Sequence, residues 1–518
     1  MNNKATGSFY TPPLLVKYMV NYAIKKKLVQ KVLEPSIGDG RFIDELLNYD
    51  VDITGIELYP EKIENYKLKS EKLKLKCSDF ISYALKNNEK FDLVIGNPPY
   101  IAKKSLPKKD WDNQYKIVDV WGLPETLFQN IWVSFVLASI KSLNKNGAIF
   151  FVLPFEFLQV QYAEKLRNFL EEKFNFIEIT TFEERVFPEI EQDVCLVYLS
   201  NIKGITPVIK YKTVNNLSEM KISNQSEICR HKPLKKWSNS ILNDQETSLL
   251  INFANRYIKI DDLGFISPGI VTGANDFFVV NKEKANNLSC CNYLLPIISK
   301  GSFISNLLIF NDTDMNQIEE LNKPSRLLNL SFIDENKFSK PLKLYLENNL
   351  DKNNLPIEKR YKCSKRGRWY DVPIIPKGDL IFFKRFDVLP KFLVNKAGVH
   401  TTDITYNVRL KEEFDPLSTA FCFYNSLTLA LCEYNGRFYG GGVNELVPSE
   451  FKSLSIPYQK IPKDKVIALD KMLREGRSIE TIIDFVDNVV FSLIKQQDIN
   501  SLKKIRNKYL KRRLKYLK

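Results

Sequence analysis

Short apolar runs recur through the first two hundred residues, and several of them end in a glycine, a proline or an acid. Helical periodicity fills the stretches between the runs. This alternation is the pattern of a doubly wound, mostly parallel sheet, in which polar residues after the strands gather at one edge. The last run is expected to close the sheet as an antiparallel strand. The seven predicted strands lie near residues 32–36, 53–58, 75–79, 91–96, 148–153, 176–181 and 194–199.

The chain has 518 residues, which is far more than one such α/β domain needs. Residues 1–240 are assigned to the α/β domain, and its end falls in a polar, lysine-rich and weakly periodic transition over 200–247. Residues 241–500 are predicted to form a second domain of mixed α+β type. Residues 501–518 are treated as a basic C-terminal tail.

A glycine turn follows the first predicted strand, over residues 36–40, and a helical period follows the turn. The turn lacks the Gly-Lys-Ser/Thr ending of a polyphosphate loop. Glu57 ends the second strand about twenty residues later, where carboxylates meet ribose hydroxyls in doubly wound sheets. Asp79 and Phe80 end the third strand and suit an adenine amino group and ring. Taken together they predict a nucleoside ligand, although each acid taken singly also fits a helix cap.

The fourth strand stops on Asn97-Pro98-Pro99-Tyr100, which suits a planar amine on an aromatic ring. Such an amine is a poor nucleophile until its two protons are held by acceptors. The Asn97 carboxamide oxygen and the Pro98 carbonyl are two acceptors, and consecutive prolines restrain the backbone that carries them. Tyr100 supplies a flat face for the ring. The alternative reading is a strand followed by an ordinary proline turn.

The balance of charge favours a polyanionic partner. Lys and Arg number 76 against 61 Asp and Glu, for a net charge of +15. Residues 501–518 hold nine Lys or Arg and no acid, with Leu510, Leu514 and Leu517 at helical spacing. This pattern predicts a basic amphipathic helix along phosphates. A membrane-surface helix is the less favoured alternative, since the sequence shows no signal peptide, lipidation motif or long apolar span.

Cysteine and histidine usage argues against several other chemistries. The two histidines, His231 and His400, disfavour histidine triads and histidine-rich metal sites. The eight cysteines show no Cys-x-x-Cys spacing, so no metal ligand set or disulfide framework is predicted. A reducing, cytoplasmic location fits this usage.

In their order and their residues these segments resemble the gamma class of adenine-specific DNA methyltransferases, the TaqI-type or Eco57I-like family. Residues 7–13 resemble its first motif, residues 34–40 its cofactor loop, and residues 97–100 its catalytic motif. Residues 182–188 resemble the segment whose aromatic residue faces the catalytic tyrosine. The resemblance implies a class I S-adenosylmethionine-dependent methyltransferase fold, with cofactor contacts from Tyr10, Thr11, Glu34, Pro35, Gly38, Gly40, Glu57, Leu58, Asp79 and Phe80. It also implies that a flipped adenine lies among Asn97, Pro98, Pro99, Tyr100 and Phe187.

The C-terminal half carries looser resemblances to the family's target-recognition region. Residues 267–278 are similar to its opening glycine-threonine-glycine segment, and residues 396–403 and 436–443 read like further elements. Residues 365–370 interleave cations with aromatic rings, as duplex binding requires, although a charge run is also typical of a solvated face. The predicted DNA contacts are Lys365, Arg366, Arg368, Trp369 and Arg437.

The resemblance therefore implies transfer of a methyl group from S-adenosylmethionine to the exocyclic N6 of adenine in double-stranded DNA, in a restriction-modification or related defence system. An RNA methyltransferase would use the same pocket, and the catalytic motif also occurs in glutamine methyltransferases that act on protein. A DNA-binding defence component that needs a partner for activity is a further alternative. Whether a cognate restriction endonuclease accompanies the chain stays open.

Overall fold

The computed structural model describes residues 10–64, 70–187, 193–217, 226–231, 234–351, 353–438 and 441–514. Residues 7–9 of the first motif, Pro188, residues 439–440 and Leu517 lie outside the described residues. The chain divides into two compact units. The first is Met1–Thr247 with Tyr439–Gly442 and Lys511–Lys518, and the second is Ser248–Phe438 with Val443–Leu510.

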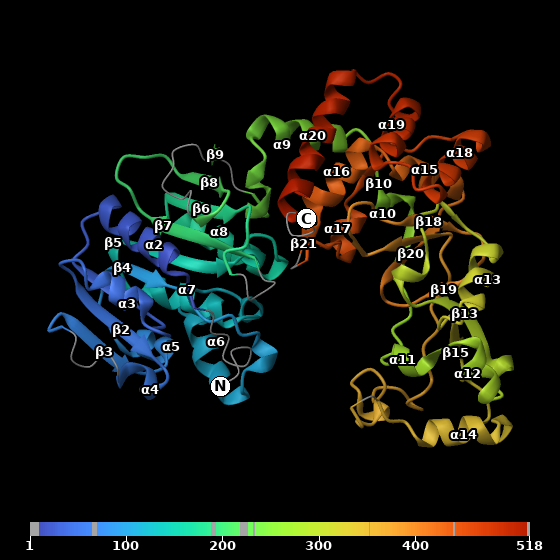
Figure 1. The fold of residues 1–518 in the computed structure, drawn as a ribbon, viewed down its shortest axis with the longest axis horizontal. Helices are drawn as coiled ribbons and strands as arrows, with labels where there is room; N and C mark the ends of the chain where they lie inside the picture. Colours follow the sequence, from blue (N-terminus) through green and yellow to red (C-terminus); the bar gives the residue numbers. More distant parts are fainter. Residues whose placement is uncertain are drawn as a thin grey trace. The chain divides into compact units, whose positions relative to one another are not determined.

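The first unit is built on a nine-stranded sheet with the order β3-β2-β1-β4-β5-β7-β6-β8-β9 (Figure 1). Each of the seven predicted strands is present. The strands are β1 (Lys31–Glu34), β2 (Asp52–Glu57), β3 (Leu73–Cys77), β4 (Phe91–Gly96), β5 (Leu143–Pro154), β6 (Phe176–Phe182), β7 (Val194–Ser200), β8 (Val208–Val214) and β9 (Ser226–Arg230). Strands β7 and β9 run antiparallel to the other strands.

Two features of this sheet differ from the prediction. Strand β7 is antiparallel as expected, but it lies between β5 and β6 and does not close the sheet. Strands β8 and β9 lie in the stretch read as a polar transition. The prediction missed these strands because their lysines are typical of a solvent-exposed loop. In the structure the lysines are paired: Lys212 forms an ion pair with buried Glu178 at 3.1 Å, and Lys210 forms one with Glu227 at 2.8 Å.

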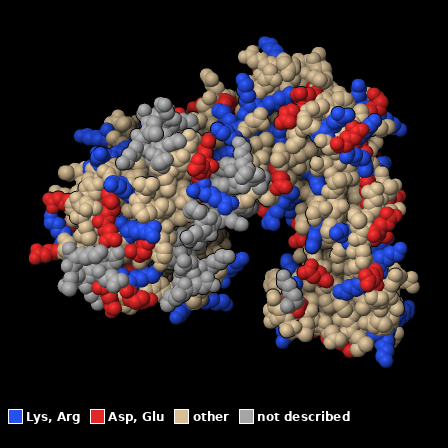
Figure 2. Space-filling view, in the orientation of Figure 1, with Lys and Arg blue, Asp and Glu red and all other residues tan. Residues whose placement is uncertain are grey.

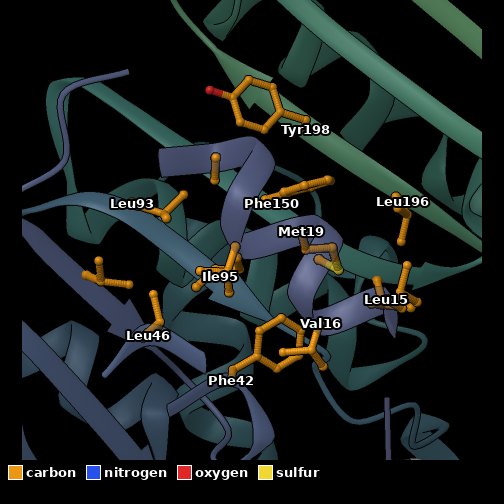
Figure 3. Close-up of a cluster of buried hydrophobic side chains, with 14 of the residues drawn as sticks. Leu15, Val16, Met19, Phe42, Leu46, Leu93, Ile95, Phe150, Leu196 and Tyr198 are labelled. Atoms are coloured by element: carbon orange, nitrogen blue, oxygen red, sulfur yellow. The ribbon is translucent and has the colours of Figure 1, made fainter. Parts of the chain in front are cut away.

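Helices cover both faces of the sheet. Alternate residues of β4 and β5, such as Leu93, Ile95 and Phe150, pack with two helices in one apolar cluster (Figure 3). The intervening Val94 and Ile149 are also buried, and a third helix contacts β5. The two helices of the cluster are α2 (Pro13–Lys26) and α3 (Arg41–Leu46), and the third is α7 (Ile131–Ser142). The other α-helices in the described part of this unit are α4 (Pro60–Ile63), α5 (Phe80–Lys86), α6 (Trp111–Asp119) and α8 (Glu164–Lys173). Helix α9 (Asp244–Ala254) begins in this unit and continues into the second.

The second unit mixes small sheets with helices, as the expected α+β character requires. Its strand orders are β11-β20-β16-β18-β14, β12-β15-β13-β19, β17-β22-β21 and β10-β23. The strands are β10 (Ile258–Lys259), β11 (Gly264–Pro268), β12 (Val279–Val280), β13 (Leu294–Ile298), β14 (Ile309–Phe310), β15 (Arg326–Leu328), β16 (Leu380–Phe383), β17 (Arg385–Phe386), β18 (Phe392–Asn395), β19 (His400–Thr401), β20 (Thr405–Leu410), β21 (Arg437–Phe438), β22 (Asn444–Glu445) and β23 (Ser455–Ile456). The helices are α10 (Ile260–Leu263), α11 (Asn275–Phe278), α12 (Lys282–Asn287), α13 (Asp312–Glu320), α14 (Lys340–Glu347), α15 (Pro416–Phe423), α16 (Ser426–Asn435), α17 (Pro448–Lys452), α18 (Lys463–Arg474), α19 (Ile479–Val490) and α20 (Gln496–Arg513).

The basic tail is helical through most of its described part, because helix α20 continues to Arg513. Its buried apolar residues are Leu502, Ile505 and Tyr509. Leu510 and Leu514 of the predicted apolar face are half-buried. Among the residues that the structure describes, no helix combines the length and apolar character needed to cross a bilayer.

Candidate active site

A cavity of about 460 Å³ opens at the carboxyl ends of β1, β2, β3 and β4 in the first unit. Its volume is in the range of sites that enclose a small molecule. The cavity forms here because the parallel strands place the segments that follow them at one edge of the sheet. The predicted site residues on its wall are Tyr10, Thr11, Glu34, Pro35, Gly38, Glu57, Leu58, Asp79, Phe80, Asn97 and Pro99.

The glycine turn and the acid at the end of β2 are joined by hydrogen bonds. Gly38 has a φ of 61° and donates its backbone N–H to Glu57 Oε2 at 2.9 Å. The other carboxylate oxygen accepts from the N–H groups of Leu58 and Tyr59 at 3.0 and 3.1 Å. These bonds hold the Glu57 carboxylate on the cavity wall, where a ribose diol can reach it. Gly40, with a φ of 81°, is the N-cap of α3 and belongs to the same turn, but it does not line the cavity.

Asp79 and Phe80 both line the cavity, and Asp79 is also a helix cap. Asp79 caps helix α5, because its side chain accepts from the Ser82 N–H at 3.0 Å, and it also lines the cavity. Burial raises the pKa of its carboxyl group above the ordinary value, although the backbone hydrogen bonds oppose the rise. Phe80 packs against Phe135, with ring centroids 5.2 Å apart, and both rings lie on the cavity wall. An aromatic ligand can therefore pack beside them.

Glu34 places a buried carboxyl group on the cavity wall. Its side chain is only 1% exposed, and within the described residues its Oε2 has no hydrogen-bond partner. Burial raises its pKa well above the ordinary value, and the carboxylates of Asp39, Glu57 and Asp44 add to the rise. A buried acceptor of this kind is costly unless a ligand completes it. The ammonium and sulfonium charges of S-adenosylmethionine fit this acidic wall.

The Asn97 carboxamide is oriented from both ends. Its Nδ2 donates to Thr11 Oγ1 at 3.2 Å, and its Oδ1 lies 3.0 Å from the Tyr100 hydroxyl, which points at it as a donor. Arg41 donates to the Thr11 carbonyl at 2.8 Å and so holds the first motif against the glycine turn. The Ser36 hydroxyl donates to the Asn97 carbonyl at 3.2 Å. Thr11 of the first motif and Ser36 of the glycine turn thus both contact Asn97, through its side chain and its backbone carbonyl respectively.

Tyr100 and Phe187 lie in one apolar cluster, but neither lies on the wall of the cavity. The Tyr100 ring is half-buried, whereas its hydroxyl reaches the Val152 carbonyl of β5 at 2.9 Å. Burial of this hydroxyl raises the pKa of Tyr100 well above its ordinary value. Phe187 is 8% exposed. Pro98 is also buried away from the cavity wall.

The predicted DNA contacts Arg366 and Arg368 hold loops of the second unit. Arg366 donates to the backbone carbonyls of Val271 and Thr272 at 3.0 and 2.7 Å. Arg368 bonds the Asp371 carboxylate at 2.9 Å and also donates to two backbone carbonyls. Their guanidinium groups therefore make hydrogen bonds within the protein, and both residues are half-buried.

The other three predicted DNA contacts differ in how exposed they are. Arg437 pairs with Glu450 at 2.8 Å, and both side chains are about nine-tenths buried. Trp369 is half-buried and packs against the ring of Phe277 at a centroid distance of 5.5 Å. Lys365 is exposed. Of the five predicted contacts, Lys365 retains the exposed cation that a phosphate needs.

A loop that the sequence reading missed forms one side of the cavity. It follows Tyr100 directly, and the signal that could have found it is its position together with its lysines. The loop and the start of α6 contribute Ile101, Ser105, Leu106, Pro107, Lys109, Asp110, Asn113 and Gln114, and α7 contributes Ile131 and Phe135.

The fold and this cavity define a class I S-adenosylmethionine-dependent methyltransferase, and comparison with known proteins narrows the class. Residues 22–187 match the family profile described as Eco57I restriction-modification methylase. Residues 234–491 match the profile described as Type II methyltransferase M.Eco57I, C-terminal domain.

Individual relatives extend the similarity along the chain. The chain is 24% identical over 535 residues to the Type II methyltransferase M.AccI of Acinetobacter calcoaceticus, covering 94% of each chain. It is 27% identical over 323 residues to M.HincII of Haemophilus influenzae, covering 61% of this chain and 56% of that one. The structure of the Type IIL restriction-modification enzyme MmeI in complex with DNA shares the fold, with a TM-score of 0.58 at 12% identity over 96% of this chain and 75% of that one.

The chain belongs to the Eco57I family of restriction-modification methylases. It is a site-specific DNA methyltransferase, and its cofactor is S-adenosylmethionine.

Proposed function

We propose that the chain methylates the exocyclic N6 of adenine in duplex DNA after the base has been flipped out of the helix. The observation that carries this proposal is the Asn97 carboxamide, which stands on the wall of the cofactor cavity with its orientation set by Thr11 and Tyr100. A carboxamide oxygen has two lone pairs, so it can accept from Tyr100 and from an arylamine together.

The residues of this site account for the reaction as follows. S-adenosylmethionine, when bound, supplies an electrophilic methyl group on a sulfonium. Asn97 and the Pro98 carbonyl accept the two amino hydrogens and localise the nitrogen lone pair toward that methyl. The new N–C bond forms as the S–C bond breaks, and the amine then releases one proton to solvent. Positioning and hydrogen bonding provide the acceleration.

Tyr100 and Phe187 are proposed as the aromatic walls around the flipped base. Flipping costs a few kcal/mol, and stacking on aromatic rings offsets part of it. Their membership of one apolar cluster supports this assignment, since the cluster also contains Ile95 of β4, which lies two residues before Asn97. The cofactor contacts named from the sequence are retained as proposals on the basis of the cavity wall they share.

The second unit is proposed to recognise the DNA target, and Lys365 is proposed as a phosphate contact. Lys and Arg are interspersed with Asp and Glu over the face shown in Figure 2, so the excess of positive charge is spread and not confined to one uninterrupted patch there. A cognate restriction endonuclease that cuts the same target is the partner that a restriction-modification role implies.

The test is mass spectrometry of nucleosides after the purified chain is incubated with unmethylated duplex DNA and isotopically labelled S-adenosylmethionine. We expect labelled N6-methyladenine, and none with Asn97→Ala. A parallel reaction with RNA serves as the competing substrate. Label in RNA alone, or label on another base, would refute the proposal, and activity only after a second protein is added would favour the partner-dependent alternative.

A further inference from the structure

Four lysines lie three to nine residues after the catalytic motif, in the loop that forms one side of the cofactor cavity. They are Lys103, Lys104, Lys108 and Lys109, and we call residues 101–110 the lysine loop. Lys109 itself lines the cavity, together with apolar residues of the same loop. The proposed reaction does not use any of these amines.

The lysine loop is fastened to the start of α7 by backbone hydrogen bonds. Lys103 donates its N–H to the Gln129 carbonyl, and the Ile101 carbonyl accepts from the Ile131 N–H, both at 2.9 Å. Ala102 and Asn130 form an antiparallel bridge between these bonds. The loop is thereby held in a defined conformation beside Asn97.

Lys103 is committed to packing within the protein. Its ammonium lies 4.7, 4.9 and 5.5 Å from the ring centroids of Trp111, Tyr115 and Phe128. Such cation–π contacts stabilise the loop and hold this amine against the three rings.

The other three amines face solvent. Lys104, Lys108 and Lys109 are exposed, and in the described part of the chain no carboxylate forms an ion pair with them. The positive charges of these three lysines repel one another on the same loop, which lowers stability in the absence of a ligand. A polyanion that docks on the loop would relieve this repulsion.

We propose that Lys104, Lys108 and Lys109 bind the backbone phosphates that flank the target nucleotide. This inference rests on the proposed function, because a base that reaches Asn97 brings its own phosphates to the mouth of the same cavity. The residues directly after Tyr100 are then the part of the chain placed to meet them. Phosphate contacts of this kind fix the register of the strand and carry no sequence information.

The test replaces the three exposed lysines together, as Lys104→Ala, Lys108→Ala and Lys109→Ala in one variant. Affinity for a fluorescein-labelled duplex that carries the mapped methylation site is measured against salt concentration. Each lost phosphate contact lowers the slope of log K against log salt by about 0.9, so the slope should fall by about 2.7. Between 50 and 200 mM salt the variant should therefore lose about 40-fold less affinity than the unmodified chain.

A matched variant separates a local effect from a loss of net charge. Lys25, Lys31 and Lys145 are also exposed, and they lie at the end of α2, the start of β1 and the start of β5, on the opposite edge of the sheet from the cavity. Replacing these three by Ala removes the same charge. The control should keep a slope close to that of the unmodified chain.

Binding of S-adenosylmethionine, followed by calorimetry, should be unchanged in a Lys104→Ala, Lys108→Ala double variant, because neither residue lines the cavity. Equal slopes in the two triple variants would overturn the inference, and so would a loss of cofactor binding by the double variant, which would place these two lysines in the cofactor site. Failure of the proposed function looks different, because the unmodified chain would then leave no labelled N6-methyladenine in DNA.

Discussion

The Tyr100 hydroxyl contacts both the proposed catalytic amide of Asn97 and the backbone of strand β5. Tyr100→Phe therefore tests what the hydroxyl contributes to the rate of methyl transfer and to stability. The substitution keeps the ring and removes one oxygen, which lies 3.0 Å from Asn97 Oδ1 and 2.9 Å from the Val152 carbonyl. Val152 is fully buried in β5, so its carbonyl loses a side-chain donor without gaining access to water. The ring can still act as a stacking wall.

The hydroxyl has a single proton, which these two acceptor oxygens share. A neutral hydrogen bond contributes about 0.5–1.5 kcal/mol, so the free energy of unfolding should fall by about 1 kcal/mol. For a unit of this size that loss lowers Tm by roughly 2–4 °C. If the hydroxyl also restrains the Asn97 oxygen by about 1 kcal/mol, kcat should fall roughly fivefold with little change in cofactor affinity.

Two further variants give the comparison its meaning. Tyr100→Ala also removes the stacking wall, which is worth about 1–3 kcal/mol per base, so it should lose roughly a further 5- to 150-fold in kcat/KM for DNA. Tyr424→Phe is the matched control in the second unit, because its buried hydroxyl also bridges two backbone groups, the N–H and carbonyl of Phe392 at 3.0 and 3.1 Å. It should lower Tm without lowering the single-turnover rate.

The assay is single-turnover methyl transfer with labelled cofactor, paired with thermal unfolding. A Tyr100→Phe variant with the rate and Tm of the unmodified chain would refute the positioning role. A variant as damaged as Tyr100→Ala would show that the hydroxyl, and not the ring, is the main contribution.

Three other substitutions test separate parts of the site. Asn97→Ala should abolish transfer while calorimetry shows cofactor affinity within about twofold of normal, because the amide is proposed to hold the amino group of the substrate. Glu34→Gln should weaken cofactor binding and flatten its pH dependence. Burial raises the pKa of Glu34, and a cationic ligand favours the ionised form, so affinity in the unmodified chain should increase as pH rises through that pKa. Arg366→Ala should lower the free energy of unfolding by about 2 kcal/mol, through its lost backbone contacts, and leave the salt slope of DNA binding unchanged.

Each of these has an outcome that contradicts it. Measurable turnover by Asn97→Ala would remove the amide from the mechanism. Cofactor affinity that is independent of pH in the unmodified chain would mean that Glu34 does not sense the bound cation. A reduced salt slope for Arg366→Ala, with stability unchanged, would restore that arginine as a phosphate contact.

The sequence by itself determined the α/β core and which side chains share the cavity wall. Glu34 and Glu57 end a strand, Asp79 and Asn97 follow one, and parallel strands bring their carboxyl ends to one edge whatever the details of packing. The order of the motifs along the chain was therefore enough to predict that these side chains would share a wall. The seven core strands were readable for the same reason, because each is a local apolar run.

Only the tertiary structure decided which side chains are committed elsewhere. The sequence around Arg366 predicts a phosphate contact, but in the structure its guanidinium donates to the carbonyls of Val271 and Thr272, more than ninety positions earlier. The sequence of strand β8 predicts a polar linker, but in the structure its Lys212 pairs with Glu178 of β6. The Tyr100 hydroxyl meets a carbonyl fifty-two residues away. Composition and spacing describe what a side chain can bind, whereas its partner is set by long-range packing, and no local pattern in the chain records that choice.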